Sequence, residues 1–196
     1  MYNGVVWTEG PKNPGGNSNV QGGAGCSAFS TVVFGGGTGT DEFNGTAWSE
    51  GGNLNQTRNN TFGFGSQNAA VAHSGNYNNG RYHTEHYDGT SWTAVNSSLL
   101  AHDGGDGGAY GTQNSAHSNK QGTDHQSYDG VTWSRTTDSS VTRFYAGISG
   151  NAQNAMMIGG RSPSVSDASV NTVEVFHDAF MSGSFLQTKK IASNYS

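Results

Sequence analysis

Short runs of alternating hydrophobic and polar residues recur along the chain, and glycine-rich or polar stretches separate them. Four such runs begin at Ala28, Asn68, Asn114 and Asn154, and further runs such as RYHTEHY (81–87) follow them. Alternation with a period of two is typical of half-buried β-strands. No window shows apolar residues at helical spacing between capping residues. The sequence therefore predicts an all-β protein made of short strands.

One six-residue motif occurs four times, and it combines an aromatic residue, Asn-Gly or Asp-Gly, two further residues and a tryptophan. The copies are YNGVVW from Tyr2, FNGTAW from Phe43, YDGTSW from Tyr87 and YDGVTW from Tyr128. Asn-Gly and Asp-Gly favour two-residue hairpin turns, because both residues tolerate positive φ. We expect each motif to form a tight hairpin in which the aromatic residue and the tryptophan are diagonal neighbours across the strand pair.

The spacing of the motifs predicts a repeat architecture. The anchors Tyr2, Phe43, Tyr87, Tyr128 and Phe176 are separated by 41, 44, 41 and 48 residues. Propeller blades have periods of ~40–50 residues, and each period here holds about four short strands. We predict a β-propeller over residues 1–176 with repeats starting near residues 2, 43, 87 and 128. The strand around Trp7 is expected to complete the last sheet and close the ring by pairing the two ends.

The recurrent aromatic residues are expected to form a repeated core, because aromatics in register usually fill a repeated interior. This predicted core comprises Tyr2, Trp7, Phe43, Trp48, Tyr87, Trp92, Tyr128, Trp133 and Phe176. The alternative is that the four tryptophans are platforms on which sugars stack.

Composition narrows the function. Only 12% of the residues are charged, the formal net charge is -5, and the nine lysines and arginines are scattered. This argues against nucleic-acid binding, which requires a clustered basic face. Aromatic residues make up 11% of the chain, which argues against disorder despite 31 glycines. No apolar run approaches the ~20 residues of a membrane span, so we expect a soluble protein.

Candidate ligand-binding residues are few. Arg58, His102 and Arg143 each follow a motif tryptophan by ten residues, and Tyr82 and Tyr110 are expected to be exposed aromatic residues that hold sugars if the protein binds carbohydrate. For the arginines, a structural role on backbone carbonyls or a carboxylate is the preferred interpretation, and a ligand-binding ring at the propeller mouth is the alternative.

No arrangement of residues typical of an enzyme is apparent in the sequence. The adjacent Asp and Gly of the motifs differ from the aspartate box of sialidases, in which one residue separates them. His83 and His86 are three apart on a predicted strand and therefore point to opposite faces. We expect no catalytic residues, no metal site and no cofactor.

The pattern decays after Phe176. The tail, residues 177–196, is either a worn hairpin or a docking segment for another subunit. Its apolar residues, whose joint exposure would be costly, are Phe180, Phe185, Leu186 and Ile191.

The order of these features resembles the kelch repeat. Strands ending VVFGGG or MMIGG are followed by EHY or EVF, an Asp/Asn-Gly turn and tryptophan. In detail the chain is similar, over residues 2–176, to kelch-like repeats in virion proteins of tailed bacteriophages, especially marine and cyanobacterial phages. Kelch propellers usually have more than four blades, which leaves open the completion of a larger ring by association.

The resemblance implies a non-enzymatic structural protein on the virion surface, as a head or tail decoration or a fibre component. Its implied partners are other virion proteins or further copies of the chain, with the tail as the docking segment. One alternative is an adhesin module that binds carbohydrate or a host receptor, such as a host-surface glycan. A further alternative is a propeller hydrolase or oxidase.

Overall fold

Three of the motifs close β-hairpins in the computed structural model, which describes residues 5–14, 22–76, 82–101, 107–120, 122–162 and 169–177. The expected diagonal arrangement is wrong, because the aromatic residue and the tryptophan lie directly opposite each other, as Tyr87 and Trp92 do. The loop therefore has four residues. Asp88 Oδ1 accepts hydrogen bonds of 2.8 Å from the backbone N–H groups of Thr90 and Ser91, and this side-chain bonding stabilises the longer turn.

The chain forms four antiparallel sheets in which consecutive strands are neighbours. The first sheet contains β1 (Gly22–Ser27), β2 (Ser30–Phe34), β3 (Thr40–Phe43) and β4 (Trp48–Glu50). The second contains β5 (Phe62–Ser66), β6 (Ala69–His73), β7 (Thr84–Tyr87) and β8 (Trp92–Val95). The third contains β9 (Gly108–Thr112), β10 (Ser115–Asn119), β11 (His125–Tyr128) and β12 (Trp133–Arg135). The fourth contains β13 (Gly147–Gly150), β14 (Asn154–Ile158) and β15 (Val173–His177).

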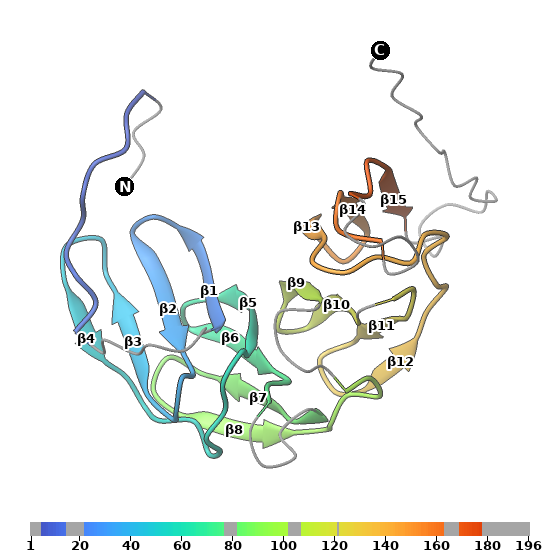
Figure 1. Cartoon of the computed structure of the whole chain (residues 1–196). Helices are drawn as coiled ribbons and strands as arrows, with labels where there is room; N and C mark the ends of the chain where they lie inside the picture. The colour runs from blue at the N-terminus through green and yellow to red at the C-terminus, as the bar shows by residue number, and fades with distance from the viewer. Residues whose placement is uncertain are drawn as a thin grey trace.

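The sheets are arranged around a common centre as the blades of a four-bladed β-propeller (Figure 1), which confirms the predicted fold class. The first strand of each sheet is the innermost, so that β1 contacts β5, β5 contacts β9 and β9 contacts β13. Glycine permits this close approach. A Cβ atom at Gly63 in β5 would overlap the backbone of Gly23 in β1.

The hydrophobic core lies between the sheets. One buried cluster joins the first and second sheets and includes Val32, Phe34, Tyr87 and Trp92. A second cluster joins the second and third sheets and comprises Phe64, Val71, Ala116, Tyr128 and Trp133. These clusters contain four of the nine recurrent aromatic residues, Tyr87, Trp92, Tyr128 and Trp133. Phe43 is also buried, whereas Trp48 and Phe176 are only partly buried.

The ring is open between the first and fourth sheets in the described part of the chain (Figure 1), contrary to the predicted pairing of the two ends. The fourth sheet has three strands there, and the segment around Pro11 lies beside β4 at the other end of the arc. Trp48 Nε1 donates a 3.0 Å hydrogen bond to the Pro11 carbonyl and holds this segment. Trp7 is consequently 80% exposed and is not part of the core. Tyr2 lies outside the described residues.

Candidate binding cleft between the third and fourth sheets

Each junction between the first three sheets is covered by a tryptophan from the later sheet. Trp92 of β8 packs edge-on against Phe34 of β2, with ring centroids 4.7 Å apart, and its Nε1 donates a 2.9 Å hydrogen bond to Thr40 Oγ1. Trp133 of β12 repeats this arrangement one sheet later. Its indole stacks on His73 at 4.5 Å, and its Nε1 donates to Thr84 Oγ1 at 3.2 Å. The motif tryptophan is therefore a contact between sheets as well as within a hairpin.

The motif tyrosines add a polar contact across the same junctions. Tyr87 donates its hydroxyl to Glu42 of the first sheet, and the Tyr128 hydroxyl lies 2.9 Å from His86 Nε2 of the second. Burial, assisted for Tyr87 by the Glu42 hydrogen bond and charge, raises the pKa of each tyrosine to about 12. Both hydroxyls therefore remain protonated at neutral pH.

Two glutamines in the turns between first and second strands also connect neighbouring sheets. Gln67 Nε2 donates to the carbonyls of Thr31 and Phe43 at 3.2 and 3.1 Å. Gln113 Nε2 donates to the carbonyls of Ala70 and Tyr87 at 3.2 and 3.0 Å. Buried backbone carbonyls of one sheet are thus satisfied by the next sheet.

The third junction lacks several of these groups. Phe176 of β15 stands where Tyr87 and Tyr128 stand, and it has no hydroxyl to donate. His125 replaces Thr40 and Thr84 as the residue three positions before the anchor. Ala152, two residues after Gly150, takes the place of Gln67 and Gln113 and has no side-chain amide to donate. The residue five positions after Phe176, where tryptophan is expected, is Met181 and lies outside the described residues.

Other contacts join the third and fourth sheets. His117 Nε2 lies 2.8 Å from the Ala152 carbonyl, and the His117 ring contacts two aromatic rings. Its centroid is 4.5 Å from that of Phe176 and 5.7 Å from that of Tyr110, which stacks on it. His117 of β10 therefore contacts both β15 and the turn before β14 in the fourth sheet.

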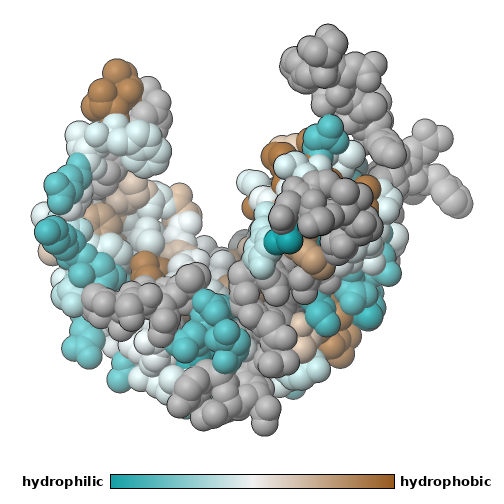
Figure 2. Space-filling model, in the orientation of Figure 1, coloured by the Kyte–Doolittle hydropathy of each residue, from teal (hydrophilic) through white to brown (hydrophobic). Residues whose placement is uncertain are grey.

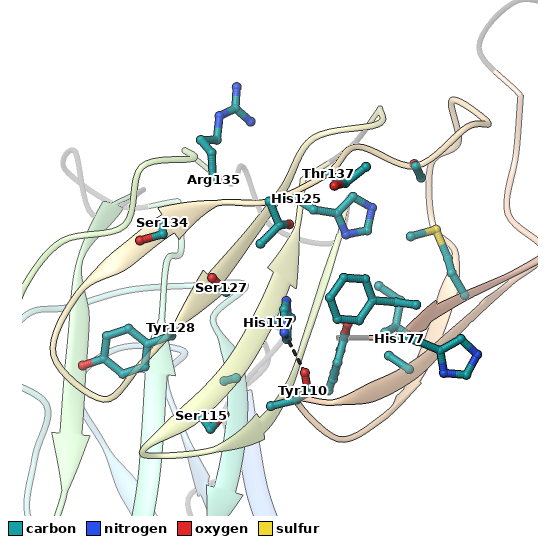
Figure 3. A pocket seen from close by; sticks show the side chains of 18 of the residues that line it. Tyr110, Ser115, His117, His125, Ser127, Tyr128, Ser134, Arg135, Thr137 and His177 are labelled. Carbon is teal, nitrogen blue, oxygen red and sulfur yellow. Dashed lines mark hydrogen bonds between the residues drawn. The ribbon is translucent and has the colours of Figure 1, made fainter. Parts of the chain in front are cut away.

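The result is a cleft of about 940 Å³ between the third and fourth sheets (Figure 3). Its aromatic and ionisable lining residues include Tyr110, His117, His125, Tyr128, Glu174 and Phe176. In Figure 3, Tyr110, His117 and His125 lie on the third-sheet side and His177 on the fourth. The volume falls within the ~300–1,000 Å³ range of small-ligand pockets.

The cleft holds ionisable groups whose pKa values are displaced. Burial lowers the pKa of His125, although the nearby Glu174 carboxylate acts in the opposite direction. Burial also raises the pKa of Tyr110. Burial alone would raise the pKa of Glu174, but hydrogen bonds from Ser140 and the charge of Arg143 outweigh it and lower that pKa. A neutral imidazole and a carboxylate therefore line the cleft near neutral pH.

Arg58 and Arg143, two of the sequence candidates for ligand binding, are buried within their own sheets. Arg58 is 0% exposed, pairs with Glu85, and its Nη1 donates to the His83 carbonyl at 3.1 Å. Arg143 is 1% exposed, and its Nη2 lies 2.6 Å from Glu174 Oε2. Both arginines thus occupy the structural role, and a ligand-binding ring at the propeller mouth does not fit their burial.

A carboxylate or amide two residues before each anchor is a structural element that the sequence reasoning missed. Glu85 Oε2 accepts from the Asn55 N–H at 2.8 Å, and Glu174 Oε1 accepts from the Ser140 N–H at 2.7 Å. In the third sheet Gln126 takes this place and accepts from the Leu99 N–H at 3.0 Å. An acidic or amide residue recurs at this position in the sequence, and this recurrence could have predicted its structural role.

The remaining sequence candidates are not brought together. Tyr110 is in the cleft but only 9% exposed, whereas Tyr82 is 45% exposed and does not line the cleft. His102 lies outside the described residues, as do the predicted docking residues Phe180, Phe185, Leu186 and Ile191.

The described ranges contain no group of three or more metal-ligating side chains. They also contain no helix long and apolar enough to cross a membrane. Comparison with known proteins yields no matching family model and no significant match among curated sequences.

Proposed function

We propose that this chain is a non-enzymatic structural protein of a phage virion, a head or tail decoration or a fibre component that presents its propeller loops outward. The proposal draws on the kelch-like repeats and on one structural observation. The first three sheets are joined by repeated tryptophan contacts, whereas the third junction, between the third and fourth sheets, is left with an open cleft. A propeller with an open cleft at one junction is suited to attachment to another protein, because a segment of that protein can bury apolar surface in the cleft.

The test of this proposal is the composition of the particle. Quantitative mass spectrometry of purified virions is expected to find the chain at a copy number in fixed ratio to a shell or tail protein. Immunogold labelling then assigns it to the head or the tail. Its absence from washed particles would overturn the proposal.

A second candidate, an adhesin module for carbohydrate or a host receptor, is favoured by the lining of the cleft. Aromatic rings, imidazoles and a carboxylate converge there, and sugars are bound by rings that stack together with polar groups that fix orientation. Saturable glycan binding that is lost in His125→Ala and retained in Tyr82→Ala would support this candidate. Unchanged binding in His125→Ala would exclude the cleft as the sugar site.

A further inference from the structure

We propose that the cleft between the third and fourth sheets receives the N-terminal arm, residues 5–9, of a second copy of this chain. The arm adds a fourth strand beside β15, and Trp7 fills the place that Trp92 and Trp133 fill at the other junctions. This inference rests on the proposed structural role and names the partner of its open junction.

The arm has the sequence of an outer strand. Residues 5–10 read VVWTEG, and residues 46–51, which include β4, read TAWSEG. In the second and third sheets the tryptophan of this segment begins the outer strand and covers the preceding sheet. The described residues of the fourth sheet include no tryptophan that covers the third sheet, and the arm supplies one in Trp7.

The arm also exposes apolar surface in the single chain. Val5 is 83%, Val6 49% and Trp7 80% exposed. Figure 2 shows hydrophobic surface at the tip of this arm of the molecule. Burying a tryptophan and two valines at an interface removes this area from water and stabilises the association.

The receiving side matches the arm. Among the described residues β15 pairs with β14, and no strand lies along its other edge. In the second sheet Tyr87 lies opposite Trp92, so Trp7 is placed opposite Phe176. Its indole then enters the cleft beside Tyr110 and His125, the counterparts of Phe64 and Thr84, both of which contact Trp133.

A second copy is favoured over the chain's own arm by the position of the anchor. The Trp48–Pro11 hydrogen bond holds residue 11 at the first sheet, and the four residues from there to Trp7 span at most about 14 Å. The fourth sheet lies at the other end of the arc (Figure 1). Since the two ends of the arc point the same way, two copies can face each other about a two-fold axis. Reciprocal exchange of arms then closes a ring of eight sheets without an exposed edge.

Cysteine cross-linking tests the occupant directly. In a Cys26→Ser background, Thr8→Cys and Val175→Cys are expected to lie opposite each other, as Thr93 and His86 do, at a separation that permits a disulfide. An equimolar mixture of the two single-cysteine proteins should form a disulfide-linked pair containing one chain of each kind. A monomeric double-cysteine protein with an internal disulfide would show that the chain's own arm fills the cleft, and no disulfide at all would show that no arm does. Either result overturns the proposal.

The oligomeric state gives an independent readout. Analytical ultracentrifugation of the full chain should show a dimer, and Trp7→Ala should weaken dimerisation at least about 30-fold, as expected for a central interface tryptophan. Phe29→Ala, which removes a ring that is 67% exposed at the turn between β1 and β2, is the matched control and should leave the dimer intact. A monomer at all concentrations would overturn the exchange of arms but not the proposed role in the virion. A dimer in solution that is absent from purified particles would overturn the role in the virion but not the exchange of arms.

Discussion

The indole of Trp133 stacks on the imidazole of His73 in the preceding sheet, with ring centroids 4.5 Å apart and ring planes inclined by 25°. Trp92 and Phe34 make the corresponding contact one junction earlier, at 4.7 Å and 69°. The two tryptophans also donate to equivalent threonines, so the junction is conserved within the molecule although the ring beneath the indole changes. The motif that closes each hairpin therefore also links one sheet to the next.

Truncating a junction tryptophan should destabilise the propeller strongly. Trp133→Ala is expected to lower the free energy of unfolding by about 3–5 kcal/mol, the usual cost of removing a large buried aromatic side chain. Trp133→Phe, which keeps a ring but loses the hydrogen bond to Thr84, should cost less. Urea unfolding followed by circular dichroism measures both, and Phe29→Ala should change the stability by no more than about 0.5 kcal/mol. A similar loss in all three variants would contradict the role assigned to the indole.

The buried ion pair of the second sheet should be far more sensitive than the surface pair of the third. Arg58→Ala leaves the buried Glu85 carboxylate without its partner and is expected to cost about 3–5 kcal/mol. Arg135→Ala breaks a 2.9 Å pair with Asp124 whose side chains are 52% and 36% exposed. That change should cost less than about 1 kcal/mol. Equal losses in the two variants, measured by urea unfolding, would show that Arg58 is not the structural arginine described above.

The turn aspartates should titrate at unusually low pH. The pKa of Asp129 is lowered by hydrogen bonds from the N–H groups of Thr132 and Val131 and from the Thr132 hydroxyl. Carbon-detected NMR titration should place its midpoint below the ordinary value of 3.8, and Thr132→Val should move it upward. Because the folded-state pKa is lowered, the stabilisation is present above the ordinary value and is lost as pH falls through the folded one. A midpoint insensitive to Thr132→Val would contradict the hydroxyl contribution.

Mildly acidic pH should weaken the fold at the cleft. Burial lowers the pKa of His125 in the folded protein below its ordinary value of 6.5. Between the folded and the ordinary pKa the unfolded chain binds more protons, so stability falls as pH drops through this window. The urea midpoint should decrease from pH 7.5 to lower pH, and the decrease should be smaller in His125→Gln, although His86, whose pKa is also lowered by burial, retains part of it. The exposed His177→Gln is the control, and an identical effect in both variants would remove His125 as the source.

Much of the fold follows from the sequence, because a period near that of a propeller blade and alternating short runs leave few other solutions for an all-β chain. The hairpin register could not be predicted from the sequence in the same way. The side chain of Asp88 accepts hydrogen bonds from two backbone N–H groups of the turn, and this favours a four-residue loop over a two-residue one. The open ring did not follow either. The sequence predicts that the strand around Trp7 completes the fourth sheet, but nothing in it indicates that Trp48 holds Pro11 beside β4 instead.

The cleft is harder to predict, because it depends on contacts between sheets that the repeat pattern does not encode. A phenylalanine at position 176 and a histidine at position 125 look like ordinary variation among repeats. Their significance appears only when Tyr128 is seen to reach His86 and Trp133 to reach Thr84. Likewise, the arginine candidates could be assigned a structural role only after Glu85 and Glu174 were seen to lie against them.

Each tryptophan covers the sheet that precedes it in the sequence, so the aromatic face of a sheet is shielded from water only by a residue made later. During synthesis on the ribosome, Phe34 stays uncovered until Trp92 is made, and His73 until Trp133 is made. A newly made sheet is therefore incompletely shielded until its successor emerges, so a pause in translation between repeats would leave one aromatic face at a time open to chaperones.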